Sequence, residues 1–275
     1  MRLPDWQTDD GCVQLHLCDA RELLLSLPDG HVDVTVTSPP YNTLPKDTKA
    51  YGFRRRKGSR IRENSGGQQP DFSRSRLRCG EDGWLKKVSS AGYDDRLPED
   101  RYQVWLTWMI SEMSRVSRGL VWINHKLRFR NGRGIHPLRW LPFDLWSEII
   151  WDRRGSMALN CGKHAPSHEY LFAFGRPHWW DDSQNKLLSV WQIPPERGCE
   201  EHPCPWPVEI PRRLIAASCP PDGLVLDPFM GRGTTALACL RLGRRFIGCD
   251  RSAAYFAAAK RLVTSALASG SAAVA

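Results

Sequence analysis

The sequence has no run of about 18 uninterrupted apolar residues, the length that a helix needs to cross a bilayer. Residues 1–7 also lack the charged stretch followed by an apolar stretch that marks a secretory signal. Apolar residues make up 41% of the 275 residues and charged residues 25%, which is ordinary for a globular protein and excludes a fibre or a disordered tail. We therefore expect a cytoplasmic protein with no membrane partner.

The cysteines also lack the regularity of a structural framework. They number nine, an odd count, and they are scattered along the chain, which does not fit a disulfide framework. Cys199, His202 and Cys204 lie close together, but the paired Cys-x2-Cys knuckles of structural zinc sites are missing. We expect neither disulfides nor a metal.

Acidic residues are scarce in residues 43–92, which we call the basic insertion. This segment holds thirteen Lys and Arg against five Asp and Glu, a net charge of +8, whereas the whole chain has +9. It is rich in Gly, Ser and Gln and has no helical or strand period, which indicates a long loop. Arginine suits bidentate contacts to phosphate or guanine, so we expect it to bind nucleic acid, with a solvated loop as the alternative. Its expected DNA-binding residues are Arg54, Arg55, Arg56, Lys57, Arg60, Arg62, Arg74, Arg76 and Arg78. Recognition could also use residues 125–140, which are rich in Arg and His.

Hydrophobic periodicity predicts alternating strands and helices. Strands are expected over 13–18, 32–37, 120–124, 147–151, 170–174, 223–227 and 245–249, and helices over 20–27, 98–116, 207–218, 234–242 and 253–263. Residues 132–146 and 152–168 give no clear assignment, and the small residues of 265–275 predict a flexible tail. This alternation predicts one α/β domain over residues 1–264, built around a mostly parallel sheet.

A glycine-rich turn follows one of the predicted strands, and we call residues 227–235 the glycine loop. The strand ends at Asp227, and Pro228, Phe229, Gly231 and Gly233 precede a helix that begins at Thr234. This arrangement puts bare N–H groups and a helix N-terminus at the carboxyl edge of the sheet, where nucleotide-like cofactors bind. Asp250 ends the next strand, where its carboxylate would accept both ribose hydroxyls of an adenosyl group.

Two other nucleotide sites compete with this interpretation. Gly231-x-Gly233-x-x-Ala236 also satisfies the loose dinucleotide pattern of nicotinamide-dependent oxidoreductases, a weak signal by itself. A carboxylate at Asp227 would repel a pyrophosphate, however, and would attract a cationic aminoacyl tail. No Gly-Lys-Ser/Thr follows the loop, which excludes a phosphate-binding P-loop.

The most distinctive motif is Thr37-Ser38-Pro39-Pro40-Tyr41-Asn42, which we call the proline motif (residues 37–42). It lies at the end of a predicted strand, and its two prolines fix an extended backbone and remove two N–H donors. Outward carbonyl oxygens, the Ser38 hydroxyl and the Tyr41 ring would together accept hydrogen bonds from a flat amino group and stack on its ring. The alternative is an ordinary proline-rich turn, which the strand-end position disfavours.

Both motifs resemble those of the S-adenosylmethionine-dependent DNA amino-methyltransferases, which act on cytosine N4 or adenine N6. In this resemblance the proline motif is catalytic and the glycine loop binds the cofactor. Residues 202–207 are similar to the segment that closes over the methionine end, residues 16–20 to the segment near the adenine, and residues 148–151 and 168–172 to later strands. The catalytic motif comes first, as in the circularly permuted β group of this family. Its usual recognition region, here 175–202, is short, so recognition is assigned to the basic insertion.

The resemblance implies a Rossmann-like methyltransferase sheet, mostly parallel with an antiparallel strand, and S-adenosyl-L-methionine as cofactor. It implies catalytic roles for Ser38, Pro39, Pro40 and Tyr41, and cofactor contacts from Asp19, Thr37, His202, Pro203, Trp206, Asp227, Pro228, Phe229, Gly231, Gly233, Thr234 and Asp250. Double-stranded DNA is the expected partner. The protein is expected to be bacterial or phage-encoded and to associate with the nucleoid. A homodimer and a separate cognate restriction endonuclease are left open as partners.

The resemblance also implies direct methyl transfer to the exocyclic amine of a flipped base, with Tyr41 stacked on it and Ser38 Oγ and the Pro39 carbonyl accepting its hydrogens. Serine, rather than aspartate, at position 38 is commoner among the cytosine-N4 enzymes, so N4-cytosine is favoured over N6-adenine. Four alternatives are left open: an RNA base, a small heteroaromatic amine, a nicotinamide-dependent oxidoreductase and a catalytically idle binding protein.

Overall fold

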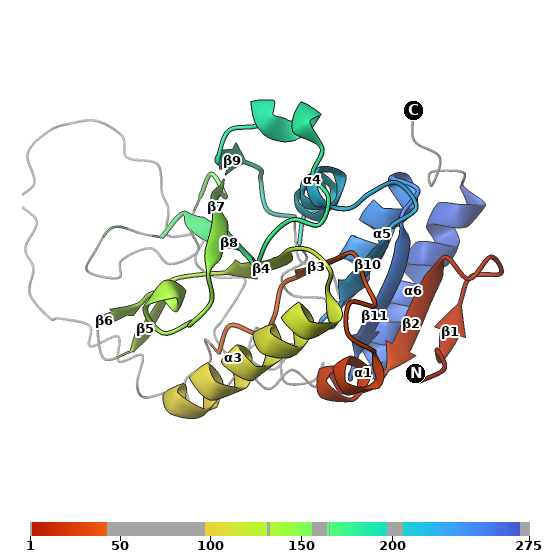
Figure 1. Ribbon diagram of the computed structural model, residues 1–275, viewed down its shortest axis with the longest axis horizontal. Coiled ribbons are helices and arrows are strands. Elements are labelled where there is room, and N and C mark those ends of the chain that lie inside the picture. The colour runs from red at the N-terminus through yellow and green to blue at the C-terminus, as the bar shows by residue number, and fades with distance from the viewer. Residues whose placement is uncertain are drawn as a thin grey trace, which may run out of the picture.

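A computed structural model describes residues 2–42, 97–130, 133–155, 164, 166–196 and 206–269 of the chain. The basic insertion lies outside the described residues, as do His202 and Pro203. Nine strands form one sheet in the order β1-β2-β11-β10-β3-β4-β8-β7-β9, and β5 and β6 form a separate hairpin (Figure 1).

The strands of the main sheet are β1 (Trp6–Gln7), β2 (Val13–Leu17), β3 (Val34–Thr37), β4 (Val121–His125), β7 (Leu145–Asp152), β8 (His168–Phe174), β9 (Val190–Gln192), β10 (Leu224–Asp227) and β11 (Arg245–Asp250). The hairpin consists of β5 (Arg128–Arg130) and β6 (Arg133–Ile135). The helices are α1 (Ala20–Ser26), α3 (Glu99–Val116), α4 (Glu209–Ser218), α5 (Thr234–Arg241) and α6 (Ala253–Ala268), with 3-10 turns η3 (Pro137–Arg139) and η4 (Asp182–Lys186).

Strand direction confirms the mostly parallel sheet. β1 runs antiparallel to β2, and β8 runs antiparallel to both β4 and β7, whereas the remaining pairs are parallel. The carboxyl ends of β2, β11, β10, β3 and β4 therefore lie side by side at one edge of the sheet. In open α/β sheets this edge is where ligands bind.

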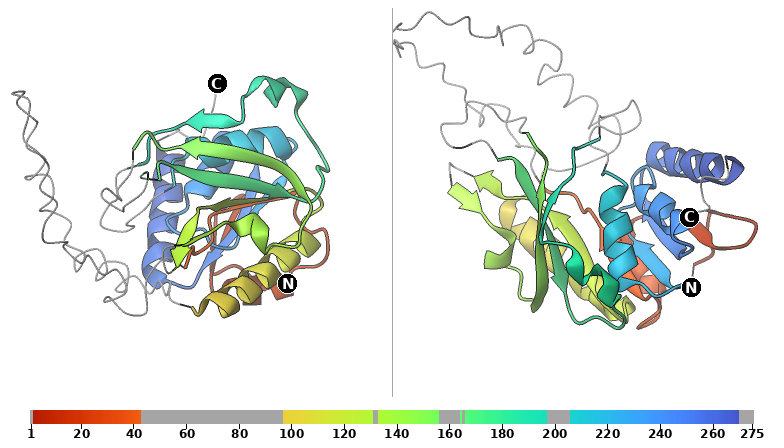
Figure 2. Two further views of the ribbon diagram at one scale, coloured as in Figure 1. Left: turned by 90° about the vertical axis from the view of Figure 1, so that its left-hand side faces the viewer. Right: turned by 90° about the horizontal axis from the view of Figure 1, so that it is seen from above.

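Helices cover both faces of the parallel strands, as Figure 2 shows from two further directions. The face of α4, α5 and α6 buries Val225 of β10 and Phe246 of β11, and the face of α1 and α3 buries the alternate residues Leu226 and Ile247. Burial on both faces explains why these strands are continuously apolar in sequence. It also leaves the strand ends as the natural place for polar side chains.

The structure departs from the sequence predictions mainly in short elements. The strands β1, β5, β6 and β9 have two or three residues each, too few to show a period. The helix α6 runs to Ala268, so the prediction that the tail begins at residue 265 is wrong by four residues. Ala266 is buried against the core there, and alanine is the strongest helix former.

The helices within the described ranges are all too short or too polar to cross a membrane.

Candidate active site

Asp227, the last residue of β10, joins the glycine loop to the proline motif. Its Oδ1 accepts a hydrogen bond of 2.6 Å from Thr37 Oγ1 and one of 3.0 Å from the Phe229 N–H, and its Oδ2 accepts one of 2.6 Å from Thr235 Oγ1. The side chain is buried, which raises the pKa of this carboxyl to about 6. The two predicted motifs, 190 residues apart in sequence, are thus held together by one carboxylate.

The glycine loop turns through two left-handed residues before α5 begins. Gly231 has φ 52° and Gly233 has φ 88°, and a Cβ on Gly233 would lie 3.0 Å from the Cβ of Ala259 on α6. Only glycine tolerates both the backbone conformation and the close approach of α6. No described side chain caps α5, so its first N–H groups are open to a ligand at the sheet edge.

Two further predicted carboxylates lie at the same edge. Asp250 ends β11 and accepts the Ser252 N–H at 2.8 Å, and burial raises its pKa to about 6. Asp19 follows β2 and accepts both the backbone N–H (2.9 Å) and Nε (3.0 Å) of Arg21. Burial acts to raise the pKa of Asp19, but the hydrogen bonds from Arg21 outweigh it and hold the pKa below its usual value.

Within the proline motif, hydrogen bonding fixes the direction of the Ser38 hydroxyl. Ser38 Oγ lies 2.8 Å from Tyr41 Oη, while Tyr41 Oη donates to Asn124 Oδ1 and lies 3.2 Å from Glu169 Oε2. Tyrosine has a single hydroxyl hydrogen, which is directed at these acceptors, so Ser38 donates to Tyr41. The lone pairs of Ser38 Oγ therefore remain to accept hydrogen bonds from another group.

Sequence reasoning missed the side chains that hold Tyr41. Asn124 lies at the end of β4, and its Nδ2 donates to a main-chain carbonyl of β8 at 3.1 Å. Glu169, on β8, is buried and accepts from Arg153 Nη1 at 2.8 Å. Asn124 could have been found, because it is a polar residue that closes an apolar strand next to the strand of the proline motif.

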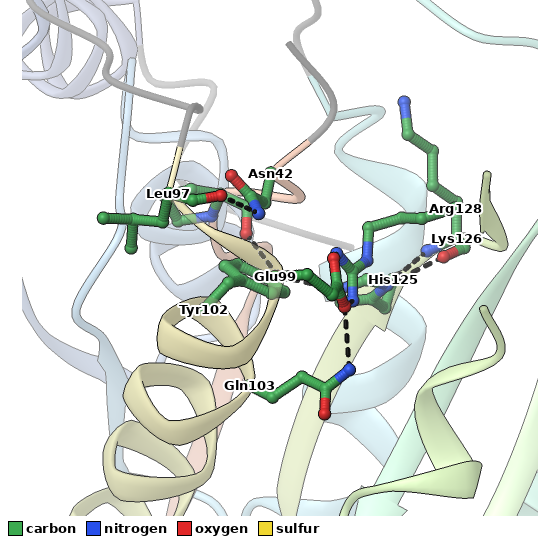
Figure 3. A network of polar contacts seen from close by, with 9 residues as sticks. Asn42, Leu97, Glu99, Tyr102, Gln103, His125, Lys126 and Arg128 are labelled. Carbon is green, nitrogen blue, oxygen red and sulfur yellow. Dashed lines mark hydrogen bonds and ion pairs between the residues drawn. The ribbon is translucent and has the colours of Figure 1, made fainter. Parts of the chain in front are cut away.

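A second group of buried polar side chains lies behind the proline motif (Figure 3). Tyr102 Oη of α3 donates to the Pro40 carbonyl at 2.7 Å and lies 2.8 Å from His125 Nε2 of β4. Burial lowers the pKa of His125 to about 3, so its ring is neutral at physiological pH. Tyr102 and His125 are each 1% exposed.

The two ends of the segment that contains the basic insertion lie next to each other (Figure 3). Asn42, in a left-handed conformation with φ 55°, donates from Nδ2 to the Leu97 carbonyl at 2.9 Å. Glu99 then forms a bidentate ion pair with Arg128 at 2.6 and 2.7 Å, and Arg128 is buried under the ring of Tyr102. This pair ties the β5–β6 hairpin to the start of α3.

Of the other residues predicted to bind the cofactor or DNA, some lie at this site, one lies in the core and the others lie outside the described residues. Thr37, Pro228, Phe229 and Thr234 adjoin Asp227 or the loop that it anchors, whereas Trp206 is buried in the core on the α4 face. His202, Pro203 and the nine predicted DNA-binding residues lie outside the described residues.

Comparison with known proteins finds type II methyltransferases among the relatives of this chain. The chain is 30% identical over 169 residues to the type II methyltransferase M1.MboII of Moraxella bovis, a match covering 56% of this chain and 59% of that protein. It is 26% identical over 293 aligned positions to the type II methyltransferase M.ScaI of Streptomyces caespitosus, covering 90% and 79%.

Two solved structures have a similar fold. The Thermus thermophilus protein TTHA0409, assigned as a DNA modification methylase and solved with S-adenosyl-L-methionine, matches with a TM-score of 0.57 and 25% identity over 91% of this chain and 93% of that one. The cytosine-N4-specific PvuII DNA methyltransferase matches with a TM-score of 0.65 and 17% identity, over 94% and 88%. Residues 32–261 match the family model for DNA methylases of the N6/N4 methyltransferase type, and the chain therefore belongs to this family.

Proposed function

We propose that this protein transfers a methyl group from S-adenosylmethionine to the exocyclic N4 of a cytosine flipped out of duplex DNA. The observation that carries the proposal is the Asp227 bridge, which holds the glycine loop and the proline motif at one edge of the sheet. A cofactor bound at the glycine loop would then lie next to a base bound at the proline motif. The catalytic motif precedes the cofactor loop although their strands β3 and β10 are neighbours, which supports a circularly permuted chain.

The cofactor supplies an electrophilic methyl group on a sulfonium, and the residues of the glycine loop would bind it. The N–H groups at the start of α5 and the Asp250 carboxylate are suited to its ribose and amino-acid parts, and Asp19, which follows β2 at the same edge of the sheet, would lie near its adenine. His202, Pro203 and Trp206 are proposed to close over the methionine end. The solved complex of TTHA0409 with S-adenosyl-L-methionine supports this cofactor.

The proline motif would activate a poor nucleophile. The lone pair of an exocyclic amine is delocalised into the ring, so its two hydrogens must be drawn out of the ring plane. Ser38 Oγ, whose hydrogen is used by Tyr41, and the Pro39 carbonyl present acceptors for these hydrogens. The nitrogen–carbon bond would form as the sulfur–carbon bond breaks and leaves a neutral thioether, and the methylated nitrogen would then release one proton to solvent water. The remaining rate enhancement would come from positioning the nitrogen in line with the methyl group.

Cofactor binding is expected to strengthen about tenfold between pH 5 and pH 7. Burial raises the pKa of Asp250 to about 6, and only the ionised carboxylate accepts both ribose hydroxyls. Isothermal titration calorimetry of S-adenosylmethionine across this range measures the effect. Asp250→Asn should flatten most of the profile, and any slope that persists reports Asp227, whose pKa lies in the same range. A flat profile for the unmodified protein would contradict the ribose role.

Ser38 is the residue that favours cytosine, and adenine N6 is the second candidate. The deciding experiment incubates the protein with S-adenosylmethionine and unmethylated mixed-sequence DNA, followed by digestion to nucleosides and mass spectrometry. We expect N4-methylcytosine. N6-methyladenine would retain the mechanism and overturn the base choice, and methylation of RNA alone would overturn the DNA substrate. An absence of cofactor binding would overturn the whole proposal.

We further propose that the basic insertion holds DNA. The described residues that flank this part of the chain, Asn42 and Leu97, are joined by a hydrogen bond of 2.9 Å, and Asn42 is the last residue of the proline motif. Residues 125–140 add a second basic stretch without Asp or Glu, in which Arg133 and Arg139 are exposed. Type II methyltransferases as relatives support a restriction endonuclease as a separate partner.

Replacing Arg54, Arg55 and Arg56 together with alanine should weaken DNA binding. The slope of log K against log salt concentration should become shallower by about 2 to 3. Each arginine that contacts a phosphate releases a counterion on binding, so its removal reduces this slope. Fluorescence anisotropy on a labelled duplex, between about 50 and about 300 mM salt, measures it. Arg176→Ala is the matched control. Arg176 is exposed and follows the carboxyl end of β8, whereas Glu169, which contacts Tyr41, lies at the other end of this strand. An unchanged slope in the triple variant, with a reduced slope in Arg133→Ala, would move the interface to the hairpin.

A further inference from the structure

Across the two prolines of the proline motif, the backbone has little freedom except at ψ of Pro40. The rings of Pro39 and Pro40 fix their φ angles at about −65°, and a following proline also restricts ψ of Ser38 and of Pro39 to extended values. Tyr41 is not a proline, so ψ of Pro40 escapes this restriction. That torsion sets the plane of the Pro40–Tyr41 peptide, and with it the direction in which the Tyr41 side chain leaves the motif.

The structure places a hydrogen-bond donor at this bond. Tyr102 Oη donates to the Pro40 carbonyl at 2.7 Å, and the direction of that carbonyl is set by ψ of Pro40. Tyr102 is on the buried face of α3, and the guanidinium of Arg128 lies 4.4 Å from its ring centroid, so the ring is held from two sides. The Tyr102 hydroxyl is therefore held in place, and its hydrogen bond to the Pro40 carbonyl fixes the plane of the Pro40–Tyr41 peptide.

The Pro40 carbonyl can only accept, so Tyr102 donates to it, and His125 Nε2 is a second partner of the Tyr102 hydroxyl. His125 Nδ1 lies 2.8 Å from the Lys126 N–H and 2.9 Å from the Lys126 carbonyl oxygen, and in the tautomer that accepts from the N–H the hydrogen of the neutral ring is on Nε2. Nε2–H then donates to Tyr102 Oη at 2.8 Å, and the single hydrogen of Tyr102 is directed at Pro40. In the opposite tautomer, Nδ1–H would donate to the Lys126 carbonyl, and Nε2 would compete with the Pro40 carbonyl for the single hydrogen of Tyr102.

We infer that Tyr102, oriented by His125, is a positioning residue that sets the Pro40 peptide and thereby aims the Tyr41 ring and the Ser38 hydroxyl at the reacting base. The inference rests on the proposed function for its kinetic consequence, but not for its structural one. Tyr102 would touch neither base nor cofactor, because it acts on the motif from the buried side.

The test replaces Tyr102 with phenylalanine, which keeps the packing and removes only the hydroxyl. We expect the single-turnover methylation rate to fall about tenfold, while the dissociation constants of S-adenosylmethionine and DNA stay within about twofold. Hydrogen exchange followed by mass spectrometry should show faster exchange at the amides of Tyr41 and Asn42. Tyr170→Phe is the matched control, since its hydroxyl contacts His168 at 3.2 Å and not the motif.

The outcomes separate the two proposals. Methylation by the unmodified protein, with the same rate and the same exchange in Tyr102→Phe, would overturn the positioning role and leave the proposed function intact. If the unmodified protein methylates no nucleic acid, the proposed function fails, and exchange alone decides whether Tyr102 orders the motif. Equal losses in Tyr102→Phe and Tyr170→Phe would show a general packing effect and would also overturn the inference.

Discussion

Replacing Asp227 with alanine is expected to lower the free energy of unfolding by about 3 kcal/mol and to abolish measurable cofactor binding. Alanine leaves three buried donors, Thr37 Oγ1, Thr235 Oγ1 and the Phe229 N–H, without their acceptor. The hydroxyls can rotate to other acceptors, but the N–H cannot, and the glycine loop is then no longer fixed to β3. Urea unfolding followed by circular dichroism measures the first effect, and calorimetry with S-adenosylmethionine the second.

The isosteric change Asp227→Asn should behave differently, because it keeps an acceptor for Thr37 and Phe229 and presents an amide to Thr235. Burial raises the pKa of Asp227 above its value in the unfolded chain, so the folded state binds more protons than the unfolded state between about pH 4 and pH 6. The contribution of Asp227 to the stability of the unmodified protein therefore falls as the pH rises through this window. We expect Asp227→Asn to be as stable as the unmodified protein or more stable at pH 7, with a smaller advantage at pH 4.

The control for both substitutions is Asp9→Ala, an exposed aspartate in a turn, for which we expect less than about 0.5 kcal/mol. If Asp227→Ala were as stable as this control, the carboxylate would not be the anchor of the two motifs. Weak cofactor binding by a stable Asp227→Asn variant would indicate that the negative charge itself attracts the cofactor. A buried charge that costs stability and aids binding would then be retained for function.

The sheet and the approximate positions of both motifs followed from the sequence because each has a strong local signal. Continuous apolar runs such as Leu224–Asp227 identify strands buried on both faces, and a glycine pair after a strand identifies the sheet edge. Their approximate boundaries also followed, because Pro, Gly and Asp mark the ends of elements locally. These signals need no knowledge of the rest of the chain.

The side chains that support the site could not be found in this way, since their roles depend on contacts between distant segments. Tyr102 lies in the apolar stripe of α3 and has the pattern of a core residue, and only the packing of α3 against β4 brings its hydroxyl to Pro40. Glu169 begins the buried part of β8, where no local feature distinguishes it. The pairing of Arg128 with Glu99 likewise joins residues 29 apart, and no local pattern in the basic stretch 125–140 predicts this ion pair.

Tyr41→Ala is expected to reduce the single-turnover methylation rate by about 100-fold or more while leaving S-adenosylmethionine affinity within about twofold. Base stacking on an aromatic ring is worth about 1–3 kcal/mol, and loss of the Tyr41 hydroxyl also allows Ser38 to turn its hydrogen toward Asn124 Oδ1, 3.4 Å away. A duplex with 2-aminopurine at the target position should show a smaller fluorescence increase on binding. Near-normal turnover in Tyr41→Ala would exclude the stacking role.

Tyr41→Phe separates the two contributions of this residue. It keeps the ring, which lies 5.2 Å from the ring of His125 and 5.1 Å from Lys126 Nζ, and removes only the hydroxyl that fixes Ser38. We expect flipping to be preserved and the methylation rate to fall about tenfold, since the hydrogen bonds of the hydroxyl to Ser38 and Asn124, about 1 kcal/mol each, and the geometry that they fix are lost. If the phenylalanine and alanine variants lost equal activity, the hydroxyl would be the main contribution of Tyr41. A full rate with phenylalanine would instead show that Ser38 keeps its lone pairs toward the base without help, leaving the ring as the reason for an aromatic residue at this position.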